Sequence, residues 1–160
     1  MKGPLAELLV VVNGAESSIE AAKFAMAMAR AYASRVTAVY VVDTATIRQL
    51  ALSRIFVPDE GEEYERSLEE TGRRYLSYVE ELAKEKRFHV QTRLLKGAIA
   101  GEVVKAAAES GADCVVIGGG DSGSAYRDAI LESYREILKN SPCPVLVVRG
   151  RKADEAYRAL

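Results

Sequence analysis

The chain has 160 residues, 49% of them hydrophobic, which is enough for one globular domain with a core of its own. Its 22 Lys and Arg residues nearly balance 23 Asp and Glu residues, and the formal net charge is -1. Nucleic acid and anionic membrane surfaces are therefore not expected as partners, because both favour a basic face. The 2 cysteines are too few for a disulfide scaffold or a four-cysteine zinc site.

The apolar runs of the chain are short. Leu8–Val12, Cys114–Ile117 and Val145–Val148 fall far below the roughly 20 residues that a membrane-spanning helix needs. Glu7 interrupts the apolar stretch near the N-terminus and no small-residue cleavage site follows, so this stretch is expected to form a strand and not a secretory signal. A cytoplasmic protein with reduced thiols is the expectation.

Strand-like and helix-like segments alternate along the chain. The first strand is expected at Leu8–Val12, and Ser17 or Ser18 is expected to cap the helix that follows, in which apolar residues recur from 19 to 33. Further strands are predicted at 36–42, 88–95, 114–117 and 145–148. Further helices are predicted at 46–52, 62–86, 99–110 (ended by Gly111), 126–138 and, as a short C-terminal element, 153–160.

This alternation predicts an α/β fold in which right-handed crossovers give a parallel sheet with helices on both faces. In such sheets, ligands bind beyond the carboxyl ends of the strands. The loops at those ends are Asn13–Ser17, Asp43–Pro58, Gly97–Ile99 and Gly118–Ser124. Any small-molecule site is therefore expected to be built from these loops.

A glycine-rich loop lies between the fourth strand and the next helix. Its sequence, Gly118-Gly119-Gly120-Asp121-Ser122-Gly123, satisfies G-x-G-x-x-G literally. The dinucleotide-binding fingerprint, however, belongs to the first strand-to-helix turn and needs an acid at the end of the next strand, where this chain has Arg149. No G-x-x-x-x-G-K-[ST] pattern occurs, so a P-loop is not predicted. The glycines either expose backbone N–H groups to a phosphate or only form a tight turn.

Four segments carry a more specific pattern. Val11–Glu16 reads V-V-N-G-A-E, Val41–Asp43 reads V-V-D, Gly97–Gly118 contains G-A-D-C-V-V-I-G, and Ser141–Arg149 reads S-P-C-P-V-L-V-V-R. These segments resemble four segments of the universal stress protein family. The first resembles the V-D-G-S-E turn after the family's first strand, and the second resembles the end of its second strand. The third is similar to its G-x-P-A … G-A-D-L-I-V-M-G segment, and the fourth is similar to its A-P-C-P-V-L-V-V-R segment. The resemblance runs collinearly from about residue 8 to residue 149.

The resemblance implies a single Rossmann-like domain with a five-stranded parallel sheet, over residues 1–150, followed by a C-terminal tail at 151–160. It also implies a homodimer through the last strand, Val145–Val148, and a role in stress survival or regulation. Many family members bind ATP and others do not. Those that bind it carry G-x-x-G, nine residues, then G-[ST], and hold the phosphates with this loop and the start of the helix.

The chain departs from that motif in either frame. If the first glycine is Gly118, the second falls on Asp121 and the G-[ST] pair on Leu131-Glu132. If the first pair is Gly120 and Gly123, the third glycine falls on Ser133. Neither frame completes the pattern.

These departures weigh against a triphosphate. In the first turn, Asn13 replaces the aspartate of the ATP binders and Ala15 replaces their serine, so that a hydroxyl donor is lost. Asp121 beside a polyphosphate costs on the order of 1 kcal/mol or more at short range, and Leu131 adds bulk where a glycine lets the backbone approach. Asn13 can still hydrogen-bond a ribose or an adenine edge, so a nucleoside or AMP is penalised less than ATP.

The expected function is a cytoplasmic stress-response or regulatory module that acts as a homodimer, with weak, altered or absent adenine nucleotide binding. The alternative is a true ATP- or AMP-binding switch with slow ATP hydrolysis. A dedicated enzyme is the least favoured class, because no nucleophile–base pair, metal cluster or Lys-bearing phosphate loop is visible. The single histidine, His89, is expected to be solvated, Cys114 to be inert core, and Cys143 to be a packed turn residue.

The candidate nucleotide-binding residues share a position at or near the carboxyl ends of the predicted strands. ATP or AMP is the candidate ligand, and no catalytic residue is assigned. The candidates are Asn13, Gly14, Ala15, Val42, Asp43, Gly97, Gly118, Gly119, Gly120, Gly123, Ser124 and Ser133.

Overall fold

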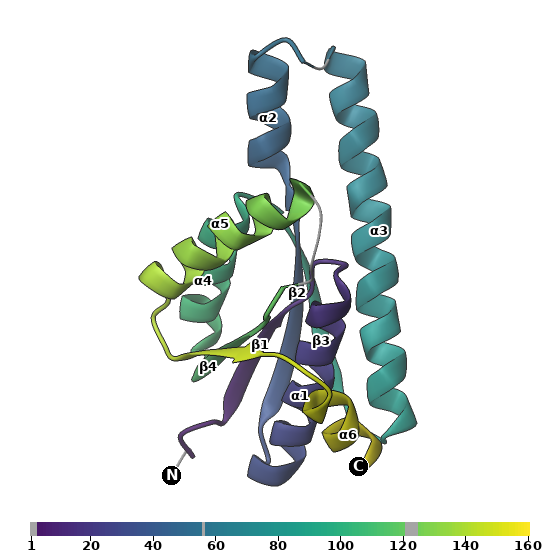
Figure 1. Cartoon of the computed structure of the whole chain (residues 1–160), viewed down its shortest axis with the longest axis vertical. Coiled ribbons are helices and arrows are strands. Elements are labelled where there is room, and N and C mark those ends of the chain that lie inside the picture. The colour runs from purple at the N-terminus through teal and green to yellow at the C-terminus, as the bar shows by residue number, and fades with distance from the viewer. Residues whose placement is uncertain (1–2, 56, 121–124) are drawn as a thin grey trace.

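Five strands form one parallel sheet with the order β3-β2-β1-β4-β5 (Figure 1). The computed structural model describes residues 3–55, 57–120 and 125–160, and the side chains at 58 and 125–131 are left out of the description. The predicted five-stranded parallel sheet of a Rossmann-like domain is confirmed. The strands are β1 (Glu7–Val11), β2 (Arg35–Asp43), β3 (Val90–Gly97), β4 (Cys114–Gly118) and β5 (Val145–Val148).

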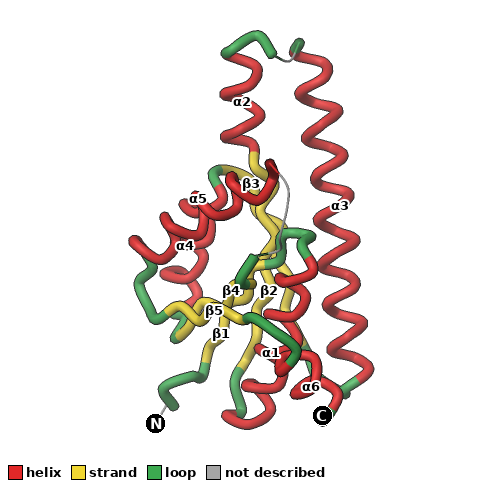
Figure 2. The backbone as a smooth tube through the Cα atoms, in the orientation of Figure 1, coloured by secondary structure: helices red, strands yellow, loops and turns green. Residues whose placement is uncertain are grey.

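Helices cover both faces of the sheet. Figure 2 shows α1, α3 and α6 on one side of the strands and α4 and α5 on the other. In the part of the chain that the structure describes, none of the helices has both the length and the apolar character of a bilayer span. The helices are α1 (Glu16–Tyr32), α2 (Thr44–Leu52), α3 (Pro58–Glu85), α4 (Ile99–Ser110), α5 (Ala125–Asn140) and α6 (Lys152–Arg158).

The central strand, β1, is buried on both faces. Its Val10 pairs with Ala38 of β2 on one side and with Val116 of β4 on the other. Val10 belongs to the core cluster under α1, α3 and α6, whereas Leu9 and Val11 belong to the cluster under α4 and α5. Successive side chains of a strand point to opposite faces, so a strand covered on both sides needs the continuous apolar run that the sequence shows.

The helices α2 and α3 extend beyond the carboxyl end of the sheet (Figure 1). With 28 residues, α3 is about 42 Å long, whereas the 9 residues of β2 span about 30 Å. The excess length of α3 therefore stands above the rim of the sheet, beside α2. Lower down, Gly72 lets α3 approach the sheet closely, because a Cβ at this position would lie 2.5 Å from the Tyr40 ring.

The start of α1 differs from the prediction. The helix begins at Glu16 with Ala15 as its N-cap residue, so Ser17 and Ser18 lie inside the first turn and the prediction that either caps the helix was wrong. The Ser18 hydroxyl donates to the Ala15 carbonyl at 2.7 Å and accepts from the Asn13 N–H at 3.2 Å. The turn between β1 and α1 is instead closed by Asn13, ahead of both serines, because Asn13 Oδ1 accepts from the Ala15 N–H at 3.0 Å.

Other elements also differ from the predicted limits. β3 begins at Val90 and ends at Gly97, later at both ends than the predicted 88–95. α3 begins at Pro58, ahead of the predicted start at 62, because the fixed φ of proline suits the first position of a helix. α4 has the predicted bounds, and Gly111 ends it in the left-handed conformation with φ +62°.

The C-terminal segment is part of the packed core. The Tyr157 hydroxyl of α6 donates to the Leu82 carbonyl at 2.7 Å and lies 3.2 Å from Oε2 of Glu85, both on α3. Burial raises the pKa of Tyr157 to about 12. On the other side, Lys23 of α1 makes an ion pair of 2.8 Å with Asp154. The tail after residue 151 therefore ties α1 to α3.

Candidate functional site

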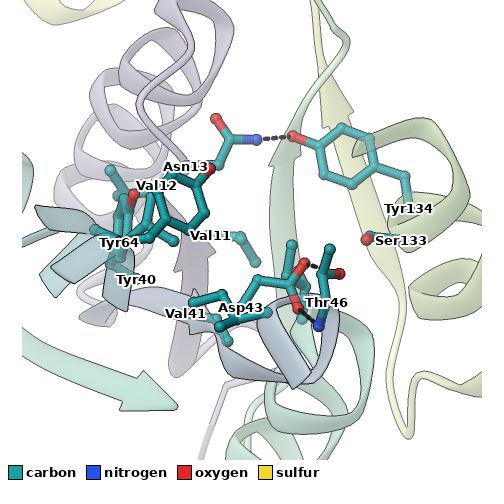
Figure 3. Close-up of a pocket in the computed structure, with 13 residues that line it drawn as sticks. Val11, Val12, Asn13, Tyr40, Val41, Asp43, Thr46, Tyr64, Ser133 and Tyr134 are labelled. Atoms are coloured by element: carbon teal, nitrogen blue, oxygen red, sulfur yellow. Dashed lines mark hydrogen bonds between the residues drawn. The ribbon is translucent and has the colours of Figure 1, made fainter. Parts of the chain in front are cut away.

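A pocket of about 150 Å³ lies at the carboxyl ends of β1 and β2. Adjacent parallel strands end at the same rim, so side chains that follow β1 and β2 meet there although they are distant in sequence. Residues of α2, α3, α4 and α5 complete the pocket, and Figure 3 shows Tyr64 and Tyr134 on opposite sides of it. It is lined by Val11, Val12, Asn13, Tyr40, Val41, Asp43, Thr46, Ile47, Tyr64, Leu68, Ile99, Ser133 and Tyr134.

Asn13 is fixed at the end of β1 by both ends of its amide. Nδ2 donates to the Tyr134 hydroxyl oxygen at 2.8 Å, while Oδ1 accepts from the Ala15 N–H at 3.0 Å. Figure 3 shows the amide and the Tyr134 hydroxyl pointing toward one another across the pocket. An aspartate at this position has no N–H to donate, so the amide is what gives this bond its direction.

Asp43 lies at the end of β2 and caps α2. Its Oδ1 accepts from the Thr46 N–H at 3.0 Å, and its Oδ2 accepts from the Thr46 hydroxyl at 2.7 Å. The negative charge therefore sits at the N-terminus of α2, where the backbone N–H groups and the helix dipole stabilise it. Each carboxylate oxygen has a second lone pair, so Asp43 keeps capacity to accept a hydrogen bond from a ligand.

The first two glycines of the glycine loop are explained by close packing. A Cβ on Gly118 would lie 2.5 Å from the Ser17 carbonyl oxygen of α1, and one on Gly119 would lie 2.6 Å from Cδ of Arg149. The Gly119 N–H donates to the Val148 carbonyl at 2.8 Å, so it is already used within the protein. Gly120 has φ +88°, which favours glycine. Asp121, Gly123 and Ser124 lie outside the described residues.

The remaining predicted residues have structural roles near the rim. Gly14 has φ +83°, and a Cβ there would lie 3.0 Å from the Tyr75 ring of α3. Gly97, with φ +148°, packs against Glu102 of α4. Val42 is fully buried in the core under α1 and α3 and does not line the pocket; its neighbour Val41 does.

Of the predicted candidates, Asn13, Asp43 and Ser133 line the pocket. Thr46, Ile47 and Ile99 also line the pocket, and they lie in the strand-end segments that were expected to build the site. The prediction from strand ends missed the lining residues that come from β2, α3 and α5, which are Tyr40, Tyr64, Leu68 and Tyr134. The helical spacing at 62–86 and 126–138 was the available signal for the helical ones, but this spacing does not tell which turn of a helix reaches the rim.

The histidine and the two cysteines do not line the pocket. Among the described residues, no group of three or more His, Cys, Asp or Glu side chains is placed to hold a metal ion. His89 is exposed, as expected. Cys114 is buried, as expected, and burial raises the pKa of its thiol, which disfavours the reactive thiolate.

Comparison with known proteins decides the family. The model of the universal stress protein family matches residues 6–149. The chain belongs to the universal stress protein family. Universal stress protein MJ0531 of Methanocaldococcus jannaschii is 31% identical, over 92% of this chain and 84% of that protein. Universal stress protein YxiE of Bacillus subtilis is 28% identical, over 89% of this chain and 98% of that protein.

Solved structures share the fold. Protein MJ0577 superimposes with a TM-score of 0.74 at 23% identity, covering 92% of this chain and 98% of that one. A universal stress protein from Archaeoglobus fulgidus, solved in complex with dAMP, gives a TM-score of 0.60 at 16% identity and covers 93% of this chain and 100% of that one. Another universal stress protein, solved in complex with cAMP, gives 0.55 at 17% identity, covering 89% and 95%.

Proposed function

We propose that this universal stress protein is a cytoplasmic, homodimeric stress-response regulator whose rim pocket binds an adenine nucleoside or nucleoside monophosphate in preference to ATP. The observation that carries the proposal is the pocket of about 150 Å³ that joins apolar walls to Asn13 and Asp43. The alternative is a switch that binds ATP and hydrolyses it slowly.

The walls of the pocket suit a flat, aromatic base. An apolar cavity of roughly 150 Å³ accepts a single aromatic ring, and the open side of this pocket leaves room for the second ring of a purine. Tyr64 contributes a ring that is half exposed at the mouth, and Val41 and Ile47 supply apolar contacts. Stacking of a base on an aromatic side chain contributes about 1–3 kcal/mol.

The polar groups suit the edge of a purine and a ribose. The Asn13 amide carries both donors and acceptors, and the Asp43 carboxylate accepts from amino or hydroxyl groups. Two structural neighbours of this fold were solved with dAMP and with cAMP. These complexes support an adenine monophosphate as the class of ligand.

The glycine loop supports a preference against ATP. The Gly119 N–H is used by the Val148 carbonyl and is not available to a phosphate chain. Asp121 follows Gly120 in the sequence and adds a negative charge to the loop; in the frame that begins at Gly118, it stands where the ATP-binding members of the family have a glycine. Glu132 makes an exposed ion pair of 3.7 Å with Arg135, which offsets part of its charge.

The proposed homodimer uses β5. This strand lies at one edge of the sheet, next to β4, so the backbone groups on its outer side are not used by the sheet. Val147 is 45% exposed on this short edge strand. An exposed apolar edge strand favours pairing with a second chain, and a second copy would cover Val147.

The proposal is tested by calorimetric titration of the purified protein with adenosine, AMP and Mg-ATP. We expect adenosine and AMP to bind and ATP to bind more weakly than AMP. Ile99→Phe, which fills the pocket, should abolish binding, whereas Leu138→Phe on the exposed face of α5 should not change it. ATP binding as tight as that of AMP would favour the switch, and no binding of any of the three would refute the pocket.

A further inference from the structure

The side chain of Arg149 lies against Gly119, the first residue after β4. Arg149 itself directly follows β5. A Cβ on Gly119 would lie 2.6 Å from Cδ and 3.1 Å from Nε of Arg149. A glycine at this position leaves room for the arginine stem in this arrangement, and the stem carries the guanidinium from the end of β5 toward the end of β4.

The position of this stem is supported by the backbone beneath it. The Gly119 N–H donates to the Val148 carbonyl at 2.8 Å, which joins the chain after β4 to the end of β5. Gly119 follows β4 and Arg149 follows β5, so the two residues in contact come directly after two strand ends that this hydrogen bond joins. An arginine stem placed in this way loses less freedom when its guanidinium binds a ligand.

The guanidinium itself is exposed and makes no ion pair or hydrogen bond with the described residues. The arginines Arg35, Arg73, Arg135 and Arg158 each pair with a carboxylate, whereas Arg149 pairs with none of the carboxylates that the structure describes. Its planar fork, with five N–H donors, matches the oxygens of a phosphate group. Among the described residues, no carboxylate pairs with this charge at the rim, where it can meet an anionic ligand.

The order of strands places this charge beside the pocket. The pocket lies over the ends of β2 and β1, and the sheet continues through β4 to β5. Neighbouring strands are about 4.8 Å apart, so Gly119 is one strand away from Asn13. If the base of a nucleotide fills the pocket, its ribose covers the distance from β1 to β4, and its 5′-phosphate can lie over the end of β4.

We propose that Arg149 binds the 5′-phosphate of the nucleotide and thereby distinguishes a nucleoside monophosphate from a nucleoside. This inference rests on the proposed function, because it assumes that the base occupies the rim pocket. Arg149 compensates for the loss of the Gly119 N–H as a phosphate donor: the Gly119–Val148 hydrogen bond that uses this N–H also joins the end of β4 to the end of β5, from which the Arg149 stem reaches over Gly119. A single cation suits one phosphate group better than three.

The experiment compares adenosine with AMP, so that the phosphate is the only difference between the ligands. Calorimetric titrations are made with the unmodified protein and with Arg149→Ala, Arg149→Lys and Arg151→Ala. Arg151 is the matched control, because it is an exposed arginine close in sequence that does not contact Gly119. Each titration is repeated at low and high salt, since an exposed charge–phosphate contact weakens with ionic strength.

We expect the unmodified protein and Arg151→Ala to bind AMP about tenfold more tightly than adenosine. Arg149→Ala should bind both ligands with the affinity of adenosine, and the salt dependence of AMP binding should largely disappear. Arg149→Lys should keep part of the preference. Adenosine binding should be equal in all variants.

The outcomes separate the two proposals. If adenosine and AMP bind the unmodified protein equally, or if Arg149→Ala keeps the preference for AMP, the role of Arg149 is refuted while the pocket stands. If neither ligand binds the unmodified protein, the proposed function fails and the role of Arg149 fails with it. A loss of adenosine affinity in Arg149→Ala would also contradict the proposal, because it would place the arginine at the base or the ribose.

Discussion

The side-chain amide of Asn13 donates to the hydroxyl oxygen of Tyr134 at 2.8 Å, across 121 residues of sequence. Asn13 follows the central strand β1, and Tyr134 is a buried residue of α5. The bond therefore ties the rim of the sheet to the helix that begins just after the glycine loop. It fixes the polar side of the pocket before any ligand enters.

Tyr134→Phe should remove this bond at little cost in volume. We expect the free energy of unfolding to fall by about 1 kcal/mol, because the Asn13 N–H loses its partner in a partly buried site. Urea denaturation of Tyr134→Phe, Asn13→Ala and the double variant would give the coupling energy of the pair. A coupling energy near zero would mean that the bond does not stabilise the rim.

Gly118→Ala should destabilise the protein, whereas Gly101→Ala should not. A methyl group on Gly118 would lie 2.5 Å from the Ser17 carbonyl oxygen, and backbone cannot move away as a side chain can. We expect a loss of about 1–3 kcal/mol. Gly101, on α4, has only the Ala98 Cβ at 3.9 Å, so alanine there should raise stability by up to about 1 kcal/mol.

Thermal unfolding of the two variants, monitored by circular dichroism, measures this contrast. Equal melting temperatures for Gly118→Ala and the unmodified protein would show that α1 can move away from β4 at this point. A lower melting temperature for Gly101→Ala would contradict the ordinary helical environment of that position.

Tyr157 should make stability fall at high pH. Burial, with a contribution from the hydrogen bond to Glu85, raises its pKa from 10.0 to about 12 in the folded protein. The neutral phenol is thus favoured by folding. The contribution of the neutral Tyr157 phenol to the free energy of unfolding is fully present below about pH 10. This contribution is lost as the pH rises from the pKa of tyrosine in the unfolded chain through the higher pKa of Tyr157 in the folded protein.

Tyr157→Phe should remove this dependence. The difference in free energy of unfolding between the unmodified protein and Tyr157→Phe should shrink by about 1 kcal/mol from about pH 8 to about pH 11. Tyr32→Phe serves as the control, because Tyr32 is exposed on α1. Parallel stability–pH curves for the unmodified protein and Tyr157→Phe would contradict the role given to burial.

Val147→Glu should dissociate the proposed homodimer. A carboxylate at the centre of β5 would face its own copy across the edge-to-edge contact, and burying such charges without a partner is unfavourable. Sedimentation velocity should give a dimer for the unmodified protein and a monomer for the variant. Leu52→Glu, on the exposed end of α2, is the control and should remain dimeric. If Leu52→Glu dissociates instead, the interface lies on the α2–α3 projection.

Much of the fold follows from local sequence. The run Leu8–Val12 has the apolar continuity of a strand covered on both faces, and β1 is such a strand, shifted by one residue to Glu7–Val11. Gly111 ends α4 because a left-handed residue closes the helix with little strain in glycine. The order of strands and helices then leaves a parallel sheet as the favourable arrangement. The start of α1 was not predicted correctly, because the side chain of Asn13 accepts from the Ala15 N–H and the helix begins before either serine can cap it.

The site was predictable only in part. Asn13 and Asp43 were found because residues after strand ends must meet at one rim, whatever the details of packing. Tyr40, Tyr64 and Tyr134 were not found as pocket residues, since each belongs to an apolar pattern that is also typical of core. The contact of Arg149 with Gly119 was equally hidden, because it depends on the register of β4 against β5.

The amino-acid sequence by itself determined the order of the elements, the parallel sheet, the family and the polar residues at the rim. These depend on periodicity and on turn residues, which act over a few neighbours along the chain. Only the tertiary structure decided which helical turns reach the pocket, which glycines serve packing, and where the arginine at the end of β5 lies. These depend on how distant elements are rotated and spaced against one another, and that is set by the close packing of the whole core.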